Sequence, residues 1–197
     1  MSKVDIPGYT YGTAAVPQSW LTLAELEELK KSVLFGDDDV AALRESLPHL
    51  SPLVDEILDV WYGFVGGNSH LVATFGRKSD GQPDEAYLAA VRKRFGQWIL
   101  DTAQANYDQR WLDYQMEIGR RHHTTSKNRT DGVAAADVVP LRHLIALIVP
   151  ITFTLRPFLE KSGKPRVAVD RMHQAWVKSV TMQTALWASA YVKRSDY

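Results

Sequence analysis

Two adjacent histidines, His122 and His123, are the side chains of this sequence best suited to chemistry. A neutral imidazole can ligate a transition metal or exchange a proton near neutral pH. The pair lies at the end of the segment WLDYQMEIGRRHH (111–123). At helical spacing, His122 falls on the same face as Trp111, Tyr114 and Ile118, whereas His123 falls on a second, less apolar face with Leu112, Met116 and Gly119. Periodicity therefore predicts that one histidine faces the core, without deciding which. Because a buried histidine more often satisfies a carbonyl than ligates a metal, the pattern alone favours a structural role.

The composition narrows what either histidine could bind. The 197-residue chain has no cysteine, which excludes disulfides, thiolate zinc sites, cysteine-ligated iron–sulfur clusters, covalent haem attachment and a cysteine nucleophile. Lys and Arg total 23, as do Asp and Glu, so the formal net charge of zero gives no overall electrostatic case for nucleic acid or an anionic membrane as partner. A transition-metal site must therefore use His, Met, Tyr or carboxylates.

Other catalytic patterns are missing from the sequence. It has no glycine-rich nucleotide loop, no G-x-S-x-G, no H-E-x-x-H and no Glu followed three residues later by His. Two basic clusters, at 92–94 and 120–129, are typical of solvated surfaces but could also flank the carboxylates of a buried cofactor. The adjacent Trp61 and Tyr62 are typical of a core helix, although a buried tyrosine hydroxyl can also donate to a bound ligand.

The elements that must position these residues are helices, because no run shows sustained strand alternation. We expect an all-α fold of seven to eight helices in one domain spanning 1–197, with an irregular arm at 1–20 and a helical core at 21–197. Thr22 begins a capping box, Gly36 is expected to end that first helix, and Pro48 is expected to stop the second. The polar stretch 124–137 is expected to be a functional or mobile loop.

The apolar run Leu144–Leu155 is shorter than the roughly 20 residues of a membrane-spanning helix and contains Pro150. We interpret it as part of a fully buried helix, 141–158, that is kinked or broken at that proline. The N-terminal residues have no apolar signal core, so a cytoplasmic location without membrane contact is expected.

Long segments of the sequence resemble the protoglobins, single-domain archaeal and bacterial relatives of globin-coupled sensors. The resemblance covers essentially the whole chain. It is carried by IPGYTYG (6–12), EILDVWYGFVG (56–66), YLAAVRKRFGQWILDT (87–102), WLDYQMEIGRRHH (111–123), the proline-containing helix around 149–158, and QAW (174–176).

The resemblance implies a globin fold, a helical sandwich extended by an N-terminal arm and an extra leading helix, around non-covalent haem b. It implies that His122 is the proximal iron ligand, with His123 as a neighbour, and that Trp61 and Tyr62 lie on the distal side. The arm would help to cover the haem, and gases would enter through narrow tunnels. The other cofactor-binding residues expected are Val65, Phe75, Phe95, Leu144, Leu147, Ile151 and, for the propionates, Arg92, although spacing does not distinguish it from Lys93 or Arg94.

The function that the resemblance implies is reversible binding of O₂, CO or NO as a sensor or carrier. The alternative is a haem enzyme with peroxidase, nitric-oxide or nitrite chemistry, or an engineered carbene-transfer catalyst with an enlarged distal pocket. Ala73 and Leu147 stand where the family has bulkier residues, which favours an open pocket, and Arg120 stands where a leucine is typical. A third hypothesis for the function is a helical signalling domain that binds no haem. A homodimer through the last two helices is also expected.

Overall fold

The structure, a computed structural model, describes residues 6–197. These residues form nine α-helices and three short 3₁₀-helices, with only two isolated β-bridges between them. In chain order the helices are α1 (Leu23–Ser32), α2 (Asp37–Leu50), η1 (Ser51–Leu53), α3 (Val54–Gly66), α4 (Ser69–Val72), η2 (Ala73–Phe75), α5 (Glu85–Gln104), α6 (Gln109–His122), α7 (Leu141–Ala146), α8 (Ile148–Glu160), α9 (Arg166–Ala188) and η3 (Arg194–Asp196). The predicted all-α architecture is confirmed.

Side-chain caps begin three helices that matter for the arrangement. Thr22 and Glu25 form the predicted capping box at the start of α1. The carboxylates of Asp84 and Asp108 accept hydrogen bonds from the backbone N–H groups three residues later, at the starts of α5 and α6. These caps satisfy N–H groups that have no partner within the helix, so they define where each helix begins.

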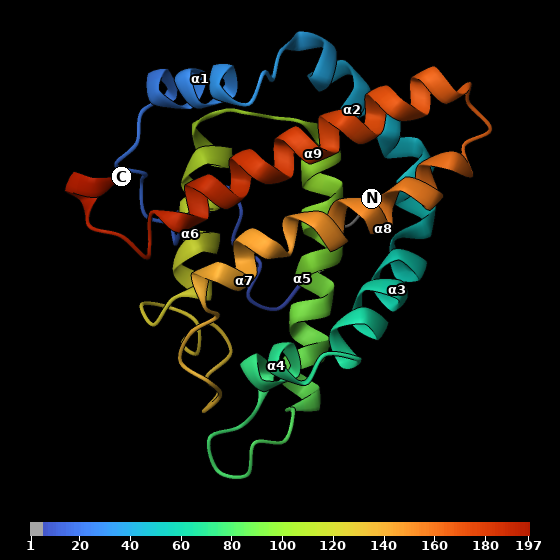
Figure 1. The fold of residues 1–197 in the computed structure, drawn as a ribbon. Helices are drawn as coiled ribbons and strands as arrows, with labels where there is room; N and C mark the ends of the chain where they lie inside the picture. The colour runs from blue at the N-terminus through green and yellow to red at the C-terminus, as the bar shows by residue number, and fades with distance from the viewer. Residues whose placement is uncertain (1–5) are drawn as a thin grey trace.

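The longest helix, α9, is the centre of the packing. Figure 1 shows it crossing α5, with α7 and α8 running antiparallel to it on one side and α2 beside it. Its Trp176 is fully buried in the main core and donates its indole N–H to Ser46 Oγ at 3.0 Å. Because a buried indole N–H needs an acceptor, this bond fixes the ring against α2.

Two predicted helix boundaries are wrong. Pro48 lies inside α2, which continues to Leu50, because Leu43 and Leu50 are fully buried in the main core and their burial outweighs the lost backbone hydrogen bond. Gly36 does not end α1, which stops at Ser32; it is the N-cap of α2.

The segment 141–158 is not a fully buried helix. Its break lies at Leu147, between α7 and α8, because Pro150 falls in the first turn of α8, where no intrahelical N–H bond is required. Ile145, Val149 and Phe153 follow one another at four-residue spacing and are 53%, 57% and 64% exposed. The span Leu141–Glu160 is long and apolar enough to cross a membrane, by criteria that core helices of soluble proteins also meet, and 28% of its most apolar window is buried.

Candidate functional site

A cavity opens in the middle of the helical sandwich, and helices far apart in the sequence contribute to its wall. The cavity has a volume of about 220 Å³. The wall consists largely of aromatic and aliphatic side chains from α3, α5, α6, α7, α8 and α9, with a small number of polar groups among them. An apolar cavity with few, specifically placed polar groups is typical of a ligand or cofactor site.

The structure gathers nine of the ten predicted site residues around this cavity. They are Trp61, Tyr62, Val65, Phe75, Phe95, His122, Leu144, Leu147 and Ile151. Arg92 is the exception and does not line the cavity. Its guanidinium donates to Asp59 and to the carbonyl of Asp55 on α3, which holds it on the outer side of the helix. Ala73 is also absent from the wall, so its small size does not enlarge the cavity.

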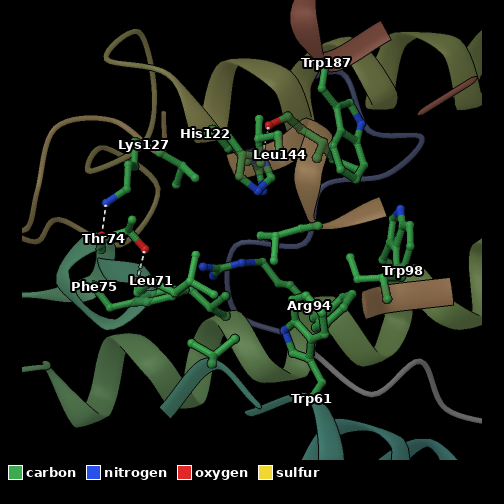
Figure 2. A pocket seen from close by; sticks show the side chains of 18 of the residues that line it. Trp61, Leu71, Thr74, Phe75, Arg94, Trp98, His122, Lys127, Leu144 and Trp187 are labelled. Carbon is green, nitrogen blue, oxygen red and sulfur yellow. Dashed lines mark hydrogen bonds between the residues drawn. The ribbon is translucent and has the colours of Figure 1, made fainter. Parts of the chain in front are cut away.

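His122 faces the cavity with one nitrogen already occupied. Its Nδ1 lies 2.9 Å from the carbonyl oxygen of Ile118, one turn earlier on α6. Since a carbonyl only accepts, Nδ1 must carry the proton. Burial lowers the pKa of His122, so the ring is neutral and Nε2 presents a lone pair. Nε2 makes no hydrogen bond with residues 6–197, and Figure 2 shows the ring nitrogen directed into the cavity.

His123 points elsewhere because the helix ends between the two residues. Its backbone is extended (φ −102°, ψ 163°), which turns the side chain away from the cavity. The ring packs edge-on against Tyr191 at 5.0 Å, and its Nδ1 lies 2.9 Å from Thr125 Oγ1. Only the first of the two adjacent imidazoles is therefore placed to hold a ligand in the cavity.

A close approach of α6 and α9 fixes the orientation of the His122 ring. The ring stacks on Trp187 of α9, with centroids 5.4 Å apart and an interplanar angle of 18°, and the indole N–H donates to Gln115 at 2.9 Å. The approach depends on Gly119, because a Cβ there would lie 2.8 Å from the Cα and the carbonyl oxygen of Trp187. The glycine thus lets Trp187 support the imidazole from behind.

The opposite wall is aromatic. Figure 2 shows Trp61 on the other side of the cavity from His122. The Trp61 ring packs edge-on against Phe95 at 5.7 Å and closes off this side with bulk. The neighbouring Tyr62 also lines the cavity, and burial raises the pKa of its hydroxyl to about 12, so the group stays protonated and can act as a donor.

Three cations and one carboxylate also line the cavity: Arg94, Arg121, Lys127 and Asp131. Arg94 makes a bidentate pair with Asp131, with N–O distances of 2.8 and 2.7 Å, whereas Arg121 pairs with Glu117 outside the cavity wall. Lys127 is 3% exposed and donates to the carbonyls of Thr74 and Ala136 at 2.9 and 2.6 Å. Within residues 6–197 it makes no hydrogen bond to a carboxylate, although Asp137 and Asp131 act on it at longer range and raise its pKa, so its ammonium can still pair directly with an anion.

The N-terminal arm packs beside these cations. Arg94 donates to the carbonyl of Pro7, and Arg121 donates to the carbonyl of Gly8 and to Thr10 Oγ1. The rings of Tyr9 and Tyr11 pack edge-on against Tyr114, which lines the cavity, at 5.4 and 5.3 Å. The arm therefore lies directly behind the cavity wall and shares its arginines.

Comparison with known proteins decides the family. The model of the Protoglobin family matches residues 22–197. The chain belongs to the protoglobin family. Among solved structures, it is similar to the globin domain of the Geobacter sulfurreducens globin-coupled sensor, with a TM-score of 0.65 and 14% identity over 85% of this chain and 97% of the other. That likeness shows a shared globin fold. Comparison with curated proteins gave no match.

Membership of the protoglobin family supports a gas-binding globin role, and the cavity is the candidate site for that role. The cavity wall also includes residues that the sequence did not point to as site residues, among them Trp98, Arg121, Lys127 and Trp187. The two tryptophans look like ordinary core residues in the sequence. The two cations lie in the basic cluster at 120–129. The only sequence feature that indicated a role for them was the possibility that this cluster flanks the carboxylates of a buried cofactor.

Proposed function

We propose that the protein binds haem b non-covalently through His122 and reversibly binds a diatomic gas on the opposite face of the haem. The observation that carries the proposal is the state of the His122 ring: neutral, protonated at Nδ1 by its bond to Ile118, and unbonded at Nε2 toward the cavity. A fixed tautomer with the second nitrogen free is the arrangement of a metal-ligating histidine. When bound, the haem iron would supply an open coordination position for the gas.

The charges around the cavity fit the two carboxylates of haem b. Arg94, Arg121 and Lys127 against Asp131 give the wall a formal charge of +2 with His122 neutral. Lys127 would be the main propionate partner because it has only carbonyl acceptors, whereas both arginines are already paired with acids. Arg94 and Arg121 would contribute at longer range while holding the arm.

The residues on the Trp61 side support a gas as the ligand. The Tyr62 hydroxyl makes no hydrogen bond with other residues in 6–197, so it can donate to a polarised diatomic molecule. A second, much smaller cavity lies beside Trp61 and Phe95 between α3, α5 and α8. Its volume is about 10 Å³. That room suits roughly one small molecule, and it would serve as a station on the entry route of the gas.

The absorption spectrum of the purified protein tests the proposal directly. The ferrous, haem-reconstituted protein should change its visible spectrum when carbon monoxide is added. His122→Ala should lose stoichiometric haem binding, whereas His123→Ala should retain it. Circular dichroism of each variant separates loss of haem from loss of fold. An unchanged spectrum with carbon monoxide, or haem loss only in His123→Ala, would refute the proposal.

The enzymatic alternative makes a separate prediction. If the pocket catalyses peroxide, nitrite or carbene chemistry, the haem-loaded protein should turn over a peroxide or a diazo ester well above free haem. Tyr62→Phe should then alter turnover, because the hydroxyl is the polar group beside Trp61. Turnover equal to that of free haem would leave gas binding as the function.

The exposed apolar face of α7 and α8, which form the first of the two helices predicted to make the dimer interface, supports a homodimer through this segment. Ile145, Val149 and Phe153 form a continuous stripe on this face, and Phe64 of α3, the helix that packs against α8, is also exposed (39%). A second copy of the chain would bury this stripe. Phe153→Glu should convert a dimer into a monomer in sedimentation analysis, whereas Leu23→Glu, at an exposed position on α1, should not. A monomeric wild-type protein that floats with lipid vesicles would contradict the dimer.

A further inference from the structure

Two histidines outside the cavity face each other at the surface. His70 lies on α4 and His143 lies on α7, and their ring centroids are 5.2 Å apart with an interplanar angle of 45°. The tilt excludes a stacked pair, and no hydrogen bond joins the two rings in the part of the chain that the structure describes. His70 is exposed and His143 is partly buried. Neither ring lines the cavity, so the pair is separate from the proposed haem site.

The spacing suits a shared metal ion. Two imidazoles on one tetrahedral Zn²⁺, with Zn–N bonds of about 2.0–2.1 Å, have ligating nitrogens about 3.3 Å apart and ring centres about 5 Å apart. Both side chains lie at the surface and can turn about their χ torsions to present a nitrogen.

We propose that His70 and His143 bind a divalent transition-metal ion of the imidazole-preferring class, such as Zn²⁺, and that the ion joins α4 to α7. No group of three or more metal-binding side chains occurs within residues 6–197, so water completes the coordination shell. The next residues along the chain, Leu71 and Leu144, both line the cavity. A bound ion therefore fixes two walls of the cavity relative to each other and slows their separation.

Calorimetric titration of the purified protein with Zn²⁺ tests the site. Wild type should bind one Zn²⁺ that His70→Ala and His143→Ala each lose or bind at least about tenfold more weakly. His49→Ala, on α2, is the matched control and should bind like wild type. Mg²⁺ should not compete, because it prefers oxygen ligands. Equal Zn²⁺ affinity in all four proteins, or no binding by wild type, would overturn the proposal.

Amide hydrogen exchange provides a second readout that does not depend on haem. Zn²⁺ should slow exchange in the 69–75 segment of wild type and should have no effect there in His143→Ala. Because His122 is intact in both proteins, ion binding at its free Nε2 would affect them equally. Unchanged exchange in 69–75 of wild type at saturating Zn²⁺ would show that the ion does not join the two helices.

Discussion

The buried ammonium of Lys127 makes the stability of the haem-free protein depend on pH. Burial lowers the pKa of this group from 10.5 to about 8. Between these values the unfolded chain binds more protons than the folded chain, so the free energy of unfolding rises with pH. At about 1.4 kcal/mol per unit of pKa, the full gain between about pH 7 and pH 9.5 is about 2 kcal/mol, and water in the cavity reduces it to about 1–2 kcal/mol. Above about pH 10 the tyrosines of the unfolded chain ionise, whereas burial keeps those of the folded chain protonated, so the free energy of unfolding falls again and the window ends.

Urea unfolding at about pH 7 and about pH 9.5 measures this gain. Wild type and Lys93→Met, which changes an exposed lysine on α5, should become more stable at the higher pH, whereas Lys127→Met should not. Haem should abolish the gain in wild type if a propionate pairs with Lys127, because a nearby carboxylate raises the pKa of the ammonium again. An equal rise in stability in wild type and Lys127→Met would refute the reasoning.

Two further predictions concern the positions that hold the cavity together. Gly119→Ala should lower the free energy of unfolding in urea by about 1–3 kcal/mol, because its Cβ would lie 2.8 Å from the backbone of Trp187. The control Gly63→Ala, where nothing lies within 4 Å of the new Cβ, should raise the free energy of unfolding by about 0.5–1 kcal/mol. Equal effects of the two substitutions would contradict this prediction. Arg94→Gln should speed amide exchange across 6–12 by removing the bond to the arm, whereas Arg92→Gln should leave the arm as in wild type; protection retained in Arg94→Gln would show that the arm is held by other contacts.

Local patterns in the sequence predicted most of the helices. The periodicity of 111–123 and the capping box at Thr22 depend only on neighbours within a few turns, and both predicted elements are present. Local patterns failed where distant packing decides. Pro48 stays helical because Leu43 and Leu50 on the same helix are buried in the main core, and 141–158 is not fully buried because no described segment covers the stripe of Ile145, Val149 and Phe153. An apolar stripe in a sequence shows that those side chains would be more stable when buried, but it does not show that another segment packs against them.

The residues of the candidate site likewise fall into those that the sequence predicted and those that it did not. The residue types and order that resemble the protoglobins identified nine residues of the cavity wall, because family motifs encode contacts that periodicity does not. Arg92 does not line the cavity, whereas Arg94 does, because successive residues on a helix point in different directions and the acidic partners of the two arginines lie on different segments.

By itself, the sequence determined the helical class, the positions of most helices, the absence of thiol ligands and a pair of histidines at the end of an amphipathic helix. Tertiary structure decided that His122 faces the cavity while His123 leaves it, because the backbone becomes extended between them. It also decided that Lys127, from a polar loop, is buried, because the carbonyls of Thr74 and Ala136 converge on its ammonium from segments far apart in the chain. Periodicity is a property of neighbours, whereas burial depends on partners that only the folded chain brings together.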